Sequence, residues 1–139
     1  MRVAPFALML LAVPFPVSGA AAAGSTQRAN CQMAGSGAWT AHVNAMPGPN
    51  ARPTLIVTGT IGVKPAARTR LRLDPAVMES DPPQYTVVLD VRLPRRPTID
   101  MLERRQVRGA WPIRGRVGAV HIRCGGRLIA SIGNVETAY

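Results

Sequence analysis

The chain has 139 residues, of which 47% are hydrophobic, 4% aromatic and 17% charged. This length fits one domain, and the apolar fraction together with the low charge density excludes a wholly disordered chain. Lys and Arg number 17 against 7 Asp and Glu, a formal net charge of +10, which favours an anionic partner. No motif in the sequence points to a known family.

Residues 1–23 have the pattern of a secretory signal peptide. Arg2 is followed by the apolar stretch Val3–Val17 and by small residues with an Ala-x-Ala sequence ending at Ala23, which predicts cleavage before Gly24. The alternative is a retained membrane anchor, but the apolar stretch contains prolines and is about 15 residues long, shorter than the ~20 that a span needs. We therefore expect a periplasmic or secreted protein with no transmembrane segment after cleavage.

Two cysteines remain in the expected mature chain, Cys31 near its start and Cys124 near its end. In an oxidising compartment an even pair most simply forms one disulfide. Neither residue belongs to the Cys-x-x-Cys motif of redox enzymes, so the pattern predicts a structural Cys31–Cys124 bond. Closing a loop of this length is expected to stabilise the fold by roughly 4–5 kcal/mol.

Residues 24–38 are small and polar and predict a lead-in segment, and alternation of apolar and polar residues begins at Trp39. We expect one all-β domain over 39–139, a small antiparallel β-sandwich of immunoglobulin-like architecture with six to eight strands, with a small β-barrel as the alternative. The alternation predicts strands over 39–45, 55–63, 68–73, 85–93, 120–124 and 128–132, with a weaker strand over 106–111.

The last two strands predict a hairpin whose loop length follows from parity. Apolar residues occupy even positions in both strands, and they face the same way only if the loop has an odd number of residues. This favours a three-residue loop, Cys124–Gly126, with Gly126 left-handed in a bulge. A two-residue Gly-Gly turn would place Leu128 opposite Arg123.

Two short helical turns are predicted between strands. Asp74 followed by proline is typical of an N-cap and first helical position, which predicts a turn over 74–79. Thr98, with acidic residues after it, predicts a second turn over 98–103. Each is too short to change the fold class.

Few residues of the sequence are suited to catalysis. The only histidines are His42 and His121, and strand parity places both on polar faces. No serine lies in a Gly-x-Ser-x-Gly elbow, and the acids are scattered. We expect no catalytic residues, and the enzyme alternative requires one of these histidines to lie in a pocket beside an acid or a nucleophile.

Metal binding is a further alternative, because thioether and imidazole ligands suit copper. The methionines of the mature chain stand isolated, with no His-x-Met or Met-x-x-Met spacing, at Met33, Met46, Met78 and Met101. A periplasmic copper-binding protein therefore stays an alternative, but gap-filling and loop methionines are the simpler interpretation. We expect neither a cofactor nor a bound metal.

Arginine dominates the charge. Eight arginines between residues 92 and 116 stand against two acids, and guanidinium groups bind phosphate and carboxylate through paired hydrogen bonds. Trp111 is the candidate aromatic anchor beside them. The alternative is a solubilising surface, as in the alternating arginines over 68–72 that protect a sheet edge. The candidate anion-binding residues are Arg92, Arg95, Arg96, Arg104, Arg105, Arg108, Arg114 and Arg116.

These patterns predict an exported, non-catalytic binding or accessory protein of the bacterial cell envelope. The expected partner is an anionic envelope component or an acidic protein, because export and the scarcity of aromatic residues for base stacking disfavour nucleic acid. The alternative is an inhibitor of a secreted hydrolase, with the stiff proline-rich loops Met46–Pro53 and Asp81–Gln84 as the inserted segments.

Overall fold

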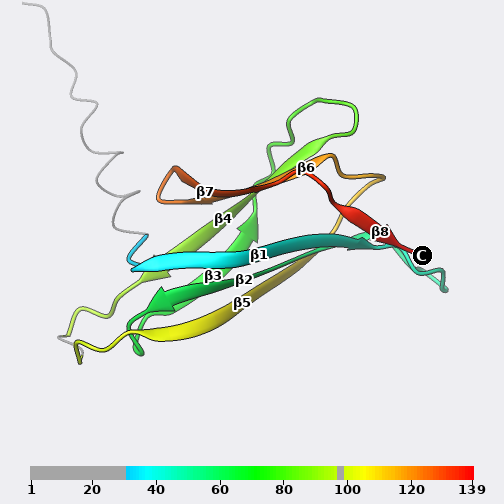
Figure 1. Ribbon diagram of the computed structural model, residues 1–139. Coiled ribbons are helices and arrows are strands. Elements are labelled where there is room, and N and C mark those ends of the chain that lie inside the picture. The colour runs from blue at the N-terminus through cyan, green and yellow to red at the C-terminus, as the bar shows by residue number, and fades with distance from the viewer. Residues whose placement is uncertain (1–30, 97–98) are drawn as a thin grey trace, which may run out of the picture.

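The computed structural model describes residues 31–96 and 99–139. The predicted signal peptide over 1–23 and residues 24–30 of the predicted lead-in lie outside the described residues, as does Thr98. The described residues form strands joined by turns and loops (Figure 1). The strands are β1 (Gly35–Asn44), β2 (Thr54–Val63), β3 (Arg68–Leu73), β4 (Gln84–Arg92), β5 (Glu103–Pro112), β6 (Ala119–Cys124), β7 (Arg127–Ile132) and β8 (Glu136–Ala138).

The strands form two four-stranded sheets, with orders β5-β2-β1-β8 and β3-β4-β6-β7 (Figure 1). The predicted β-sandwich is confirmed, and the sheets do not close into the barrel that was the alternative. Most strand pairs are antiparallel, as expected, but β1 pairs with β8 and β4 pairs with β6 in parallel. Parallel neighbours need a crossover, and β5 supplies it for β4 and β6 by passing through the other sheet.

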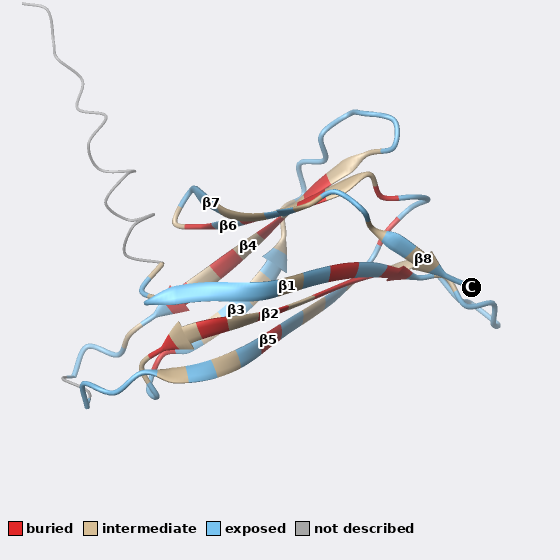
Figure 2. Ribbon diagram, viewed as in Figure 1, coloured by how far each residue is buried: buried red, intermediate tan, exposed pale blue. Residues whose placement is uncertain are grey.

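The core lies between the sheets, where the period-two pattern places every second side chain. Buried residues of β2 and β4 alternate with more exposed ones along each strand (Figure 2). The largest fully buried side chains come from both sheets and are those of Leu55, Ile61, Leu89, Ile122, Val43, Val57, Val63, Val87, Val91, Val120 and Cys124.

Two tryptophans fill the interior by lying over glycines of sheet β5-β2-β1-β8. A Cβ atom at Gly59 would overlap the ring of Trp39, and one at Gly109 would overlap the ring of Trp111. Both tryptophans are half-buried against the core residues. The glycines are therefore needed for close approach of the rings to the backbone rather than for a turn.

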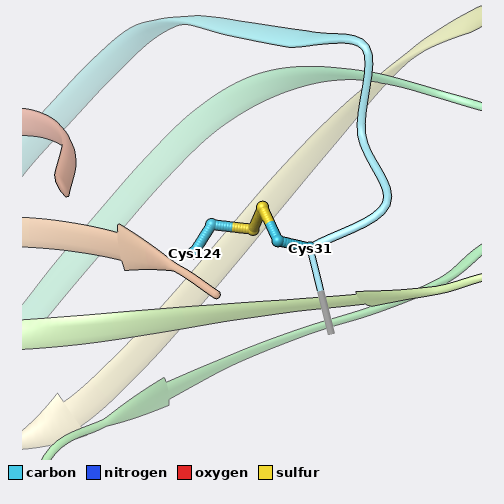
Figure 3. The surroundings of a disulfide bond; sticks show 2 residues. All are labelled: Cys31 and Cys124. Carbon is cyan, nitrogen blue, oxygen red and sulfur yellow. A yellow bond between two sulfur atoms is a disulfide. The ribbon is translucent and has the colours of Figure 1, made fainter. Parts of the chain in front are cut away.

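The predicted disulfide is confirmed. Cys31 and Cys124 are joined across 93 positions with their Cα atoms 5.3 Å apart, and Figure 3 shows the bond between the segment before β1 and the end of β6. Cys31 also forms an isolated β-bridge with Val91 of β4. The chain then crosses to the other sheet, where the Ala34 N–H donates to the Gly62 carbonyl at 2.8 Å. Regular pairing begins at Gly35 rather than at Trp39, where the alternation of the sequence begins.

The turn between β6 and β7 has two residues, Gly125 and Gly126, because Cys124 pairs directly with Arg127. Both glycines have positive φ, 57° and 78°, as a type I′ hairpin turn requires. The predicted three-residue loop is therefore wrong.

The extra residue that parity demands lies in β7 instead of the loop. Arg123 pairs with Leu128, but Ile122 pairs with Ala130, so Ile129 occupies a bulge. The bulge lets Ile129 pack against the core while Leu128 is 49% exposed. Parity indicates one extra residue between the paired strands, but it does not tell whether that residue lies in the loop or in a strand.

The predicted helical turns are not formed in the described residues. The Asp74 carboxylate accepts a hydrogen bond from the Ala76 N–H at 2.9 Å, which makes a local turn without a helix. Met78 then pairs with Gln84 in an isolated bridge, and residues 99–102 lead without a helix into β5. The described part of the chain also has no helix with the length and apolarity needed to cross a bilayer.

Candidate functional site

Five exposed arginines lie on the outer face of β3, β4 and β6. On β3 every second side chain points outward, because Leu71 and Leu73 pack against the core on the other side. The strand pairing brings one arginine of β4 and one of β6 onto the same face. We call this set the arginine face: Arg68, Arg70, Arg72, Arg92 and Arg123.

The register places like charges close together on the arginine face. Arg68 lies directly opposite Arg92 in the antiparallel pair β3–β4. Arg72 and Arg123 flank Val88 from the two neighbouring strands. Side chains directly opposite in a sheet have Cβ atoms about 4.5–5.5 Å apart, and like charges in that position destabilise the pair. An anion between the guanidinium groups would remove this repulsion.

Two acids, Asp74 and Asp90, lie among these arginines. Asp90 lies opposite Arg70 in the register and accepts a hydrogen bond from the Arg72 Nε at 3.2 Å. The Arg72 side chain is 50% exposed, so this ion pair is partly screened by water. In the described part of the chain no ion pair engages the other four arginines of the face.

Two shallow hollows lie between the arginines. The first, of about 280 Å³, is lined by Arg68, Thr69, Arg70, Asp90 and Arg92. The second, of about 350 Å³, lies toward the β6–β7 turn and is lined by Arg72 and Arg123 together with the acids Asp74 and Asp90. Each is open to solvent and has a guanidinium group on two of its strands. Planar guanidinium groups arranged in this way can hold a tetrahedral oxyanion by paired hydrogen bonds.

The arginines predicted as binding candidates lie on several different surfaces. Arg92 belongs to the arginine face, and Arg95 and Arg96 are exposed in the loop between β4 and β5. Arg104 and Arg108 project from β5, on the outer side of the other sheet. The remaining exposed candidates, in the loop between β5 and β6, are Arg114 and Arg116.

Arg105 is engaged within the protein. Its guanidinium group donates to the carbonyl oxygens of Ala67, at 2.5 Å, and Pro65, at 2.7 Å. The same group forms an ion pair with the Glu103 carboxylate. These contacts attach the first residues of β5 to the turn between β2 and β3, so Arg105 has a structural role.

Trp111, the candidate anchor, directs its ring into the protein. The ring lies over Gly109 and packs with the cluster that contains Leu55 and Val57. A side chain in this position contributes to the packing of the sandwich, and little of its ring is left for a partner.

Four members of the arginine face were missing from the predicted set. Three of them, Arg68, Arg70 and Arg72, were recognised as one cationic strand face but were interpreted as edge protection. Arg123 gave no signal, because its place on the face depends on the pairing of β4 with β6, which are not consecutive in the sequence.

The histidines differ in their surroundings. The His121 Nε2 lies 2.8 Å from the Gln84 Oε1, and the Ser131 Oγ lies 3.0 Å from the His121 Nδ1. This links a hydroxyl to an imidazole, as a nucleophile requires, and the third group is a neutral amide, whose oxygen can orient the ring but carries no charge to balance an imidazolium. The contacts connect β4, β6 and β7 as a side-chain ladder. His42 is exposed on β1.

The methionines that would supply a copper site are separated. Met33 packs against the core, whereas the other three are exposed in three different loops. Residues 31–96 and 99–139 also contain no cluster of three His, Cys, Asp or Glu side chains arranged to hold a metal ion.

The two loops predicted as the inserted segments of a hydrolase inhibitor belong to the connections of β1 with β2 and of β3 with β4. Met46–Pro53 is mostly exposed, and its Pro53 carbonyl accepts a hydrogen bond from the Ile113 N–H at 2.8 Å. Asp81–Gln84 is held by the Gly118 N–H, which donates to the Pro83 carbonyl at 2.9 Å. Both loops are therefore anchored to the connection between β5 and β6.

Comparison with protein-family models, curated proteins and solved structures finds no match for this chain. No ligand can therefore be transferred to the arginine face from a relative. Charge, register and exposure are the grounds on which a function is proposed.

Proposed function

We propose that this protein is an exported, non-catalytic binding protein of the bacterial cell envelope that holds an anionic ligand on its arginine face. The signal-peptide pattern over 1–23 supports export. The Cys31–Cys124 bond supports an oxidising compartment, because such bonds persist outside the cytosol.

The observation that carries this proposal is the placement of Arg68 opposite Arg92 without an acid between them. A face used only for solubility has no need to hold two guanidinium groups in this repulsive position. Arg70 adds a third cation to the same hollow, and Asp90 forms its ion pair with Arg72. The uncompensated charge is therefore concentrated at the Arg68–Arg92 end of the face.

Binding by this face is electrostatic and multivalent. Exposed guanidinium groups attract phosphate, sulfate or carboxylate groups over about one Debye length, ~10 Å at 0.1 M salt. Flexible side chains on neighbouring strands then form paired hydrogen bonds with successive anionic groups. Affinity for a polyanion should therefore fall steeply as the salt concentration rises.

Heparin, a soluble sulfated polyanion, provides the test. The variant Arg68→Gln/Arg70→Gln/Arg92→Gln removes three charges from the arginine face. The matched control Arg108→Gln/Arg114→Gln/Arg116→Gln removes three exposed charges from elsewhere. We expect the first variant to bind heparin about tenfold or more weakly at ~0.1 M salt, and the control to change much less.

Equal weakening by the two variants would show that only total charge matters, and the proposal would fail. It would also fail if native protein bound heparin with the same affinity at low and high salt. Circular dichroism and thermal unfolding of each variant establish that weaker binding is not caused by misfolding.

A further inference from the structure

Three large apolar side chains are exposed within one short stretch of the loop between β4 and β5. The exposed fractions of Ile99, Met101 and Leu102 are 74%, 62% and 61%. Monomeric proteins seldom leave neighbouring large apolar side chains in water without a use for them. We call these three residues the apolar tip.

Cations are numerous at the end of the sandwich that carries the apolar tip. Figure 1 shows that the loop between β4 and β5 lies at the same end of the sandwich as the turn between β2 and β3. Arg68 begins β3 and Arg92 ends β4 at this end, so the arginine face reaches the tip. Seven cations stand against Asp100 and Glu103, a net of +5: Lys64, Arg68, Arg92, Arg95, Arg96, Arg104 and Arg105.

Contacts between the two connections hold the tip outward. The Lys64 Nζ lies 3.1 Å from the Asp100 Oδ1, next to Met101. Arg105 binds the carbonyls of Pro65 and Ala67, which fixes the start of β5 against the turn between β2 and β3. An ion pair whose Asp100 side chain is 97% exposed therefore links the described part of the loop to the turn between β2 and β3, while the apolar side chains of the tip are exposed to solvent.

We propose that this end of the sandwich docks on a bilayer containing anionic phospholipids. The apolar tip enters the boundary between headgroups and acyl chains, and the surrounding arginines bind headgroup phosphates. This inference rests on the proposed function, and it identifies the anionic ligand as a lipid headgroup held in a membrane surface.

The geometry favours a bilayer over a second copy of the chain. Two copies meeting at their tips would bring two regions of +5 together, and this repulsion opposes self-association. The described residues of the loop expose three large apolar side chains, and β3 begins and β4 ends with an arginine at the same end of the sandwich. A membrane surface offers partners for both, because headgroup phosphates lie just outside the acyl chains.

Vesicle co-sedimentation tests the inference with the disulfide-bonded chain. The probes are vesicles of phosphatidylcholine with about 30 mol % phosphatidylglycerol and vesicles of phosphatidylcholine alone. The tip variant is Ile99→Ser/Met101→Ser/Leu102→Ser. Its matched control, Met46→Ser/Val77→Ser/Met78→Ser, replaces three exposed apolar residues of other loops.

We expect native protein and the control to bind the anionic vesicles, and the tip variant to bind them at least about tenfold more weakly. Leu102→Trp should show blue-shifted fluorescence on these vesicles and quenching by brominated acyl chains. Equal binding by the tip variant and native protein, or no quenching at Leu102→Trp, would overturn the inference.

Heparin binding separates this inference from the proposed function. If native protein binds heparin through the arginine face but does not bind anionic vesicles, the function stands and the membrane inference fails. If heparin binding does not depend on the arginine face, the proposed function fails. Retention of heparin affinity by the tip variant, together with loss of vesicle binding, is the result that supports both.

Discussion

The two sheets of the sandwich differ in which face carries unusual residues. One sheet has arginines on its outer face, and the other has tryptophans on its inner face. Sheet β3-β4-β6-β7 has a regular apolar inner face and an outer face with five arginines and the acids Asp74 and Asp90. Sheet β5-β2-β1-β8 has threonines, including Thr40, Thr58 and Thr60, on its outer face. Its inner face holds the two tryptophans over glycines.

Because of this difference, the free energy of unfolding and the affinity for anions should depend on different faces of the molecule. The inner face of sheet β5-β2-β1-β8 demands exact space for two rings, so small changes there should alter the free energy of unfolding. The outer face of sheet β3-β4-β6-β7 is exposed and carries repulsive charge, so changes there should alter affinity for anions and hardly affect folding. Each prediction below changes either the interior of the sandwich or the arginine face. The property that depends on the other region serves as the control.

The largest effect is expected from loss of the disulfide, which anchors the N-terminal segment to sheet β3-β4-β6-β7. The variant Cys31→Ser/Cys124→Ser should lose roughly 4–5 kcal/mol of stability, because the unfolded chain is no longer restricted. Chemical denaturation measures this loss. The anion affinity of the fraction that remains folded should stay near the native value. A change of affinity without loss of stability would contradict the claim that stability and anion binding depend on different regions.

Substitution of the glycines beneath the tryptophans should destabilise the other sheet. Gly59→Ala and Gly109→Ala place a Cβ atom where the rings of Trp39 and Trp111 lie, and each should cost about 1–3 kcal/mol. Gly133→Ala is the matched control, because a Cβ there meets nothing within 4 Å. Thermal unfolding measures the loss, and a control as unstable as Gly59→Ala would refute the packing argument.

Removal of the Asp90 charge from the arginine face should have the smallest effect. Asp90→Asn frees Arg72 and raises the local net charge, so heparin affinity at low salt should increase by roughly two- to threefold. Stability should change by less than about 1 kcal/mol, because the ion pair is partly exposed. Unchanged or weaker heparin binding by this variant would place the ligand elsewhere.

Much of the fold could be predicted from local patterns. Period-two alternation located the main strands, and the presence of only two cysteines in the expected mature chain identified the disulfide. The β6–β7 hairpin shows the limit of such patterns. Parity required one extra residue, but a bulge at Ile129 and a longer loop satisfy parity equally well, and two consecutive glycines allow the tighter turn.

The candidate site was harder to predict, because nearness in sequence is a poor guide to nearness on a sandwich. Arg92 and Arg104 are close in the sequence, but they lie on different sheets, since the chain crosses over between β4 and β5. Arg92 and Arg123 are distant in the sequence, but the parallel pairing of β4 with β6 places them on one face. Long-range strand order, which alternation does not encode, determined where the charge collects.

Chemical modification of arginine tests the central claim most directly, because it identifies the arginines that a bound anion covers. Phenylglyoxal labelling with and without heparin, read by mass spectrometry, should show protection at Arg68, Arg70 and Arg92. Labelling of Arg108, on the other sheet, and of Arg114, in the loop between β5 and β6, should stay unchanged. Protection of Arg108 and Arg114 equal to or greater than that of the arginine face would contradict the assignment of the binding surface.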